Sequence, residues 1–102
     1  MDDNKLFLEE IAKSKKVGRP TDELALMWLN LVNRILIKPS YKQFANQGDY
    51  VQEAILNLCK NGLKFDEQKS QNPYAYFHTV IVGSFCQVNA RENRQRKIRE
   101  LQ

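Results

Sequence analysis

The sequence predicts an all-α protein, organised as a compact bundle of three main helices preceded by a short N-terminal helix. Apolar residues recur at intervals of three and four positions along three separate segments, which is the periodicity of amphipathic helices. No segment keeps the strict apolar–polar alternation of a half-buried strand. A chain of 102 residues that is 42% hydrophobic and 10% aromatic also fits a single domain around one core.

The N-terminal segment predicts a short helix followed by a basic connector. Its apolar residues recur at helical spacing from Leu6 to Ile11, behind acidic and amide residues that can cap a helix. Residues 13–20 then hold four cations and no acid, and they include a glycine and a proline. We therefore expect residues 1–20 to form an N-terminal helix with its connector, and residues 21–102 to form the main helical domain.

The next segment predicts the most hydrophobic helix and the centre of the core. Thr21 is a suitable N-cap, and the two acidic residues after it complement the positive end of the helix dipole. Pro39 predicts that the helix ends near Lys38, because the residue before a proline disfavours helical backbone. The residues expected to face the core are Leu24, Met27, Trp28, Leu31, Val32, Ile35 and Leu36.

Residues 40–48 are expected to form a turn in which Tyr41 and Phe44 anchor the chain to the core. A helix is expected over residues 49–61, and Gly62 is suited to the left-handed position that ends many helices. The residues of this helix expected to face the core are Val51, Ile55, Leu58 and Cys59.

The last helix is predicted to begin at Asn72 and Pro73, after a polar loop over residues 67–71. Asparagine is a good N-cap, and proline fits the first helical position because its missing N–H is not needed there. The helix is expected to continue past Arg91. The residues on its core face are predicted to be Phe77, Ile81, Phe85 and Val88.

The residue content argues against an enzyme or a metalloprotein. His78, Cys59 and Cys86 lack the paired spacing of metal ligands, and we interpret the two cysteines as buried thiols. Asp49 and Glu53 share a helix face, but exposed acids at this spacing usually form a solvated or partner-facing surface. No phosphate-binding loop or nucleophile motif occurs. We therefore expect no catalysis, no cofactor and no metal. The acidic N-terminus and the lack of a long apolar run predict a cytoplasmic protein that has no contact with the membrane.

Positive charge is concentrated at the end of the chain, within the same helix that begins with an aromatic cluster. The formal net charge is +4, and residues 91–102 carry five cations and two acids. Tyr74, Tyr76 and Phe77 form the cluster. Aromatic faces on which bases stack, beside cations that follow phosphates, suit single-stranded nucleic acid. The same pattern also fits a core phenylalanine, an interfacial tyrosine and a solvated basic tail, and spacing alone does not separate the two interpretations.

Three motifs resemble, in order and at matching distances, region 2 of bacterial sigma factors. Residues 49–53 (DYVQE) resemble the opening of the family's clamp-binding helix, and residues 63–66 (LKFD) resemble its ending. Residues 72–77 (NPYAYF) resemble the start of the DNA-melting helix in the compact, extracytoplasmic-type members. The succession of residues 62–67 (GLKFDE) and 72–76 (NPYAY), together with the small size, makes the chain most similar to the late-transcription sigma factors of T4-type bacteriophages. Residues 19–48 fit that family more loosely, and residues 1–18 match no part of it.

The resemblance implies a specificity subunit of RNA polymerase, working in the host bacterial cytoplasm in association with the nucleoid. Such proteins bind the clamp coiled coil of the largest subunit of core RNA polymerase. They recognise an A·T-rich −10-like promoter element as an opened non-template strand, and a phage co-activator is a further partner to expect. By position, the resemblance assigns to the polymerase Asp49, Gln52, Glu53, Leu56, Asn57 and Lys60. It assigns to the DNA Tyr74, Tyr76, Phe77, Gln87, Asn89, Arg91, Arg94, Arg96 and Lys97.

The sequence departs from the family at two places. Thr79 and Val80 stand where housekeeping sigma factors carry two tryptophans, so another side chain must act as the wedge or the polymerase must contribute more to melting. Leu101 and Gln102 do not resemble the hydrophobic tail with which T4-type factors bind the polymerase flap. We therefore expect that flap contact is missing, is supplied by another protein, or is made by a part of the native protein outside this sequence. Two other functions stay open. One is a phage-encoded adaptor or inhibitor that binds polymerase without directing it, and the other is a small helical DNA-binding transcription regulator.

Overall fold

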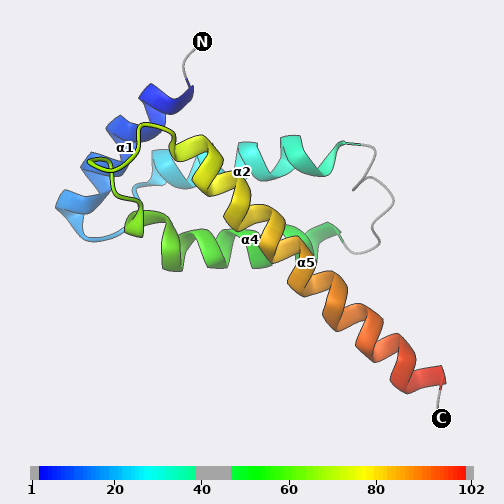
Figure 1. The fold of residues 1–102 in the computed structure, drawn as a ribbon. Helices are drawn as coiled ribbons and strands as arrows, with labels where there is room; N and C mark the ends of the chain where they lie inside the picture. The colour runs from blue at the N-terminus through cyan, green and yellow to red at the C-terminus, as the bar shows by residue number, and fades with distance from the viewer. Residues whose placement is uncertain (1–2, 39–46, 101–102) are drawn as a thin grey trace.

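The structure of the protein is a computed structural model that describes residues 3–38 and 47–100, with side chains for residues 4–38 and 47–94. Within these ranges it contains helices and no strand, which confirms the all-α prediction. The elements are α1 (Asp3–Val17), α2 (Asp22–Leu36), α4 (Gln47–Asn61), the short 3-10 helix η1 (Gly62–Lys64) and α5 (Pro73–Glu100). Figure 1 shows that α5 packs across α4 and that its C-terminal half projects away from the other helices.

Aromatic rings from three helices meet at the centre of one core. Phe77 of α5 packs edge-on against Phe7 of α1, with ring centroids 4.9 Å apart, and against Trp28 of α2 at 5.5 Å. All three rings are buried, and burial of a side chain of this size stabilises the fold by about 1.5–3 kcal/mol. Because Phe7 and Ile11 are both buried in it, α1 shares this core with α2, α4 and α5.

Helix α1 is longer than the sequence predicted. It continues through the lysines to Val17, so it occupies most of the expected connector over residues 13–20. Lysine is a good helix former, and nothing before Gly18 interrupts the helix. Gly18 ends it with φ of 87°, and its N–H donates to the Ser14 carbonyl at 2.8 Å. A left-handed glycine at this place is a common way for a helix to stop.

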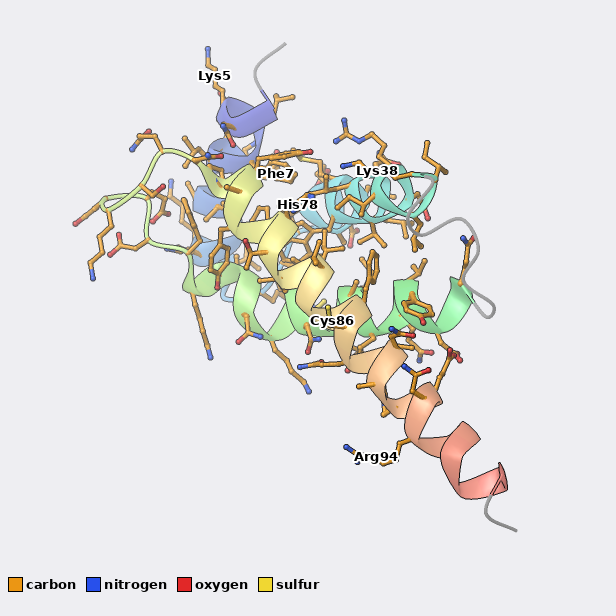
Figure 2. All side chains as sticks on the ribbon, turned by 45° about the vertical axis from the view of Figure 1, so that its right-hand side comes forward. Lys5, Phe7, Lys38, His78, Cys86 and Arg94 are labelled. Atoms are coloured by element: carbon orange, nitrogen blue, oxygen red, sulfur yellow. The ribbon has the colours of Figure 1, made fainter. Side chains whose placement is uncertain are left out.

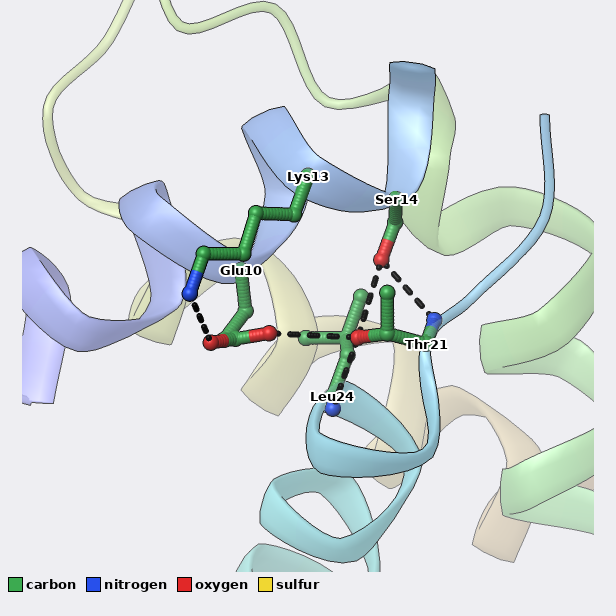
Figure 3. Close-up of polar contacts among 5 residues, drawn as sticks. All are labelled: Glu10, Lys13, Ser14, Thr21 and Leu24. Carbon is green, nitrogen blue, oxygen red and sulfur yellow. Dashed lines mark hydrogen bonds and ion pairs between the residues drawn. The ribbon is translucent and has the colours of Figure 1, made fainter. Parts of the chain in front are cut away.

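A hydrogen-bonded corner joins α1 to α2 (Figure 3). The Thr21 side chain accepts from the Leu24 N–H at 3.2 Å, which confirms the predicted N-cap. The Thr21 hydroxyl donates to Glu10 Oε2 at 3.2 Å, and the Thr21 N–H donates to Ser14 Oγ at 2.9 Å. Because Ser14 is buried, these bonds satisfy a polar group that would otherwise be costly to remove from water. The corner therefore fixes the angle between the two helices.

The ends of α2 and α4 lie close to their predicted positions. Helix α2 ends at Leu36, two residues before the predicted end. Helix α4 begins at Gln47, so Gln47 and Gly48, which were expected in the turn, are helical. The predicted turn anchors Tyr41 and Phe44 lie outside the described residues.

The start and the core face of α5 are as predicted. The helix begins at Pro73, and Asn72 Oδ1 accepts from the Ala75 N–H at 3.2 Å as an N-cap does. The predicted inward residues Phe77, Ile81, Phe85 and Val88 are all buried.

The core face of α4 is rotated by about one residue from the predicted one: Leu58 is buried as predicted, and Val51 and Ile55 pack against the edge of the core. The buried residues of α4 are Tyr50, Ala54 and Leu58. Val51 and Ile55 are only half-buried, and Cys59 is exposed. Cys86 of α5 is exposed as well, so the prediction of two buried thiols is wrong. Each of these four residues directly follows a buried one, and one step along a helix turns the side chain by about 100°.

Gly62 does not take the left-handed position predicted for it. Of the four glycines in the chain, all of them described, only Gly18 has a positive φ. Gly62 instead begins η1 directly against the indole of Trp28. A Cβ at this position would lie 2.5 Å from Trp28 Cζ2, closer than any real contact allows. Gly62 is therefore required by the close approach of η1 to α2.

Candidate functional site

The outer face of α4 carries four of the six residues assigned to the polymerase. Asp49, Gln52, Leu56 and Lys60 are exposed, and they follow one another at intervals of three or four residues. They therefore lie along one side of the helix, which we call the α4 stripe. Leu56 is 47% exposed and supplies the apolar contact area of an otherwise polar surface.

The other two assigned residues, Glu53 and Asn57, face α5. Glu53 Oε2 lies 3.2 Å from an Arg91 guanidinium nitrogen. The Asn57 amide donates to Ser84 Oγ at 2.7 Å and to Gln87 Oε1 at 3.3 Å. Residues assigned to the polymerase therefore contact residues assigned to the DNA. We call this row of contacts, formed by Glu53, Asn57, Ser84, Gln87 and Arg91, the α4–α5 seam.

Tyr50 extends the contact between α4 and α5 toward the start of α4. Its ring packs edge-on against Phe85 at 5.7 Å, and its hydroxyl donates to Glu92 Oε2 at 3.5 Å. Burial raises the pKa of Tyr50 above its ordinary value, and the nearby Glu92 carboxylate raises it further. The hydroxyl therefore stays protonated and remains a donor at neutral pH.

Phe77 is part of the core and is not available to stack on a base. Its side chain is 0% exposed, and its ring lies between Phe7 and Trp28. Exposing it would disrupt the packing of three helices, and loss of such a ring from a core costs about 3–5 kcal/mol. The assignment of Phe77 to DNA binding is corrected accordingly, because the aromatic cluster divides between core and surface.

A surface pocket of about 470 Å³ lies where η1 and the loop after it meet the start of α5. Tyr76 forms one wall, with its ring tilted against Phe65 at 5.5 Å and its hydroxyl donating to the Asn61 carbonyl at 2.8 Å. Lys64 and Lys69 also line the pocket, so two basic residues share its surface with the aromatic wall. The other lining residues are Phe65, Asp66, Ser70, Asn72, Ala75 and Thr79.

Sequence reasoning found one wall of this pocket and missed the rest. Tyr76 was assigned to DNA binding, whereas Lys64 and Lys69 were assigned no role. The available signal was a polar loop that follows Lys64, contains Lys69 and leads directly into the aromatic cluster. The pocket itself depends on how η1 folds back on α5, which no local pattern encodes.

Tyr74 is half-buried on another side of α5. Its ring stacks on His78 with centroids 6.1 Å apart and planes inclined by 30°. Its backbone N–H donates to Asn4 Oδ1 of α1 at 2.9 Å. Both tyrosine rings therefore contact another ring of the protein, and of the two it is Tyr76 that lines the pocket.

Tyr76 and Arg94 lie on the same face of α5. Residues 76, 83, 87, 90 and 94 are separated by steps of seven, four, three and four, which keep to one side of a helix. Gly83 and Ala90 are exposed and small, so no bulky side chain projects at these two positions between Tyr76 and Arg94. About 27 Å of helix separates the ends, given a rise of ~1.5 Å per residue. We call the residues Tyr76, Gly83, Gln87, Ala90 and Arg94 the α5 stripe.

The basic end of α5 extends beyond the bundle. Figure 2 shows Arg94 on the projecting half of the helix, and its side chain is exposed. Asn89 is exposed but lies on a different side of α5 from the α5 stripe. Arg96 and Lys97 belong to the same helix, and their side chains lie outside the described residues.

No further chemistry is evident elsewhere in the described part of the chain. Among residues 3–38 and 47–100, no three His, Cys, Asp or Glu side chains come together in a way that could hold a metal ion. None of the described helices is long and apolar enough to cross a membrane. Comparisons of the chain with models of known protein families, with curated proteins and with solved structures found no match.

Proposed function

We propose that this chain is a minimal phage-type sigma factor. In this proposal the α4 stripe docks on the clamp coiled coil of core RNA polymerase, and the α5 stripe captures the opened non-template strand of an A·T-rich −10-like promoter element. The identity of both partners comes from the sequence resemblance. The observation that carries the proposal further is that the pocket at Tyr76 and the basic end at Arg94 lie on one face of α5, which borders α4 along the α4–α5 seam.

The α5 stripe suits a single strand better than a closed duplex. The ring of Tyr76 offers a surface for one unstacked base, and base–aromatic stacking contributes about 1–3 kcal/mol. Lys64 and Lys69 provide cations for the phosphates next to that base. Gly83 and Ala90 allow a sugar–phosphate backbone to lie close to the helix, and Arg94 supplies a cation at its far end. A strand held this way must already be unstacked, so polymerase binding has to precede or accompany capture.

The direct test is initiation by purified core polymerase on a promoter with an A·T-rich −10-like element. We expect specific transcripts when the protein is present and none when it is absent. An absence of both clamp binding and initiation refutes the proposal.

Docking is tested with two exposed leucines. Leu56→Ala is expected to weaken binding to core polymerase about tenfold, because burial of an apolar side chain of this size contributes about 1.5–3 kcal/mol and alanine keeps only part of it. Leu26→Ala on α2 is the matched control, since Leu26 is also exposed and lies on another helix. Equal binding by both variants contradicts the assignment of the α4 stripe to the polymerase.

Strand capture is tested at Tyr76. Tyr76→Leu removes the aromatic wall and is expected to reduce open-complex formation while polymerase binding stays intact. Retained melting favours the adaptor or inhibitor, which needs only the α4 stripe. Tight binding to closed duplex DNA without polymerase favours the small DNA-binding regulator. Both of these results count against a sigma factor.

A further inference from the structure

Lys15 connects α1 to the loop that forms the pocket. Its ammonium group donates to the Phe65 carbonyl at 2.7 Å and to Glu67 Oε2 at 2.8 Å. These partners lie 50 and 52 residues further along the chain, where η1 ends and the loop begins. A charged donor with one carbonyl and one carboxylate partner makes stronger hydrogen bonds than a neutral donor does. Lys15 therefore holds the first flank of the pocket.

Asn4, at the opposite end of α1, holds the second flank. Its side-chain oxygen accepts from the Tyr74 N–H at 2.9 Å, in the first turn of α5. The first N–H groups of a helix have no partner within the helix, so this bond satisfies one of them from outside. Asn4 and Lys15 are about 16 Å apart along a helix. One rigid element thus contacts the loop where it begins and where it ends.

The middle of α1 is fixed in the core. Phe7 packs against Phe77 at 4.9 Å, and Ile11 is fully buried. Because both side chains lie between Asn4 and Lys15, α1 cannot shift toward or away from the loop without disturbing the core. The two flank contacts are therefore set by the packing of the bundle.

We propose that α1 is a positioning element that holds the loop over residues 65–72 in the shape that makes the pocket, through Lys15 at the start of the loop and Asn4 at the first turn of α5. The loop is irregular and its lining residues come from both of its flanks, so its shape depends on what holds the flanks. A pocket already shaped before binding loses less conformational freedom when a ligand enters. The nature of that ligand, a single DNA strand, rests on the proposed function, whereas the positioning itself does not.

The first test measures the loop without any ligand. Lys15→Met keeps much of the side-chain length and removes both hydrogen bonds. Lys16→Met is the matched control, because Lys16 is the next residue of the same helix and is exposed. We expect amide hydrogen exchange over residues 66–72 to accelerate about tenfold in Lys15→Met and to stay unchanged in Lys16→Met. Unchanged exchange in Lys15→Met overturns the inference.

The second test uses a conservative substitution at the other flank. Asn4→Ala removes the acceptor for the Tyr74 N–H, whereas Asn4→Asp keeps an oxygen in its place. Positioning is supported if amide exchange over residues 66–72 is faster in Asn4→Ala than in the wild type and returns to the wild-type rate in Asn4→Asp. Urea unfolding, followed by the fluorescence of Trp28, confirms that each variant is folded. Equal exchange in Asn4→Ala and Asn4→Asp overturns the role given to this bond.

The third test connects the loop to strand capture, using a fluorescent A·T-rich single-stranded oligonucleotide and the complex with core polymerase. We expect the affinity of this complex for the strand to fall about tenfold in Lys15→Met while its assembly is unaffected. If Lys15→Met has faster exchange in the loop but keeps the wild-type affinity for the strand, the connection between loop shape and strand capture is overturned. A wild-type complex that binds no strand refutes the proposed function instead, and the exchange measurements then decide the positioning role by themselves.

Discussion

Alanine substitution at Gly62 tests the tightest approach in the fold. A Cβ added there meets three atoms of the Trp28 indole, at 2.5, 2.8 and 3.4 Å. The indole cannot simply move away, because Trp28 is fully buried and packs against Phe77 at 5.5 Å. Either η1 must move away from α2, or the aromatic centre of the core must rearrange.

Two opposing effects set the magnitude for Gly62→Ala. Overpacking a core usually costs about 1–3 kcal/mol. Alanine also gains about 0.5–1 kcal/mol over glycine where the backbone is helical, since it has less freedom to lose on folding. Steric overlap is the larger effect, so we expect a net loss of about 1–2 kcal/mol. For a domain of this size such a loss corresponds to a fall in Tm of roughly 4–16 °C.

Urea unfolding followed by circular dichroism measures this loss, and Gly48→Ala provides the control. Gly48 lies in the first turn of the preceding helix, and a Cβ there meets no atom within 4 Å. Only the backbone effect remains, so Gly48→Ala is expected to stabilise the protein by about 0.5–1 kcal/mol. A lower free energy of unfolding in Gly62→Ala and a higher one in Gly48→Ala would show the effect of the close contact between Gly62 and Trp28. Stabilisation by Gly62→Ala would refute the reasoning.

Three further predictions concern the core, the pH dependence and the basic helix end. Phe77→Ala is expected to reduce the free energy of unfolding by about 3–5 kcal/mol, whereas Tyr74→Ala costs clearly less, and urea unfolding compares the two. Because the pKa of Tyr50 is raised in the folded protein, the contribution of Tyr50 to stability is fully present below pH 10.0 and is lost as the pH rises through the folded-state pKa. Thermal melts between pH 9 and 12 should show this loss of stability. The loss should be smaller in Tyr50→Phe, which lacks the titrating hydroxyl. If Arg94 contacts one phosphate, Arg94→Gln is expected to reduce the slope of log K against log salt concentration for single-strand binding by about 0.7. Binding titrations at several salt concentrations measure that slope.

Local chemistry made the helices predictable. Thr21 and Asn72 cap their helices as expected, because capping needs only a short polar side chain at the right position. The core face of α5 was also predictable, since four large apolar residues at helical spacing leave little choice of face. Helix α4 is more ambiguous, and the row that packs against α5 includes the polar-tipped Tyr50 rather than Cys59.

Contacts between distant segments were not predictable. The role of Gly62 depends on Trp28, which lies 34 residues earlier in the sequence, so its position after a helix suggested a left-handed cap instead. Lys15 belonged to a stretch interpreted as a basic connector, yet its partners lie beyond α4. Phe77 fitted either a core or a base-stacking surface from spacing alone, and only the packing of α1 and α2 around it decides between them.

The α4–α5 seam separates residues that hold the fold from residues that remain free to bind. Asn57 donates to Ser84, which is buried, so this bond satisfies a polar group inside the protein and Asn57 is poorly suited to a partner. The ion pair between Glu53 and Arg91 is different, because the Arg91 side chain is 59% exposed and such pairs contribute only about 0–1 kcal/mol. Under the proposed function, a phosphate that binds Arg91 would therefore replace the contact with Glu53 at a cost of only about 0–1 kcal/mol.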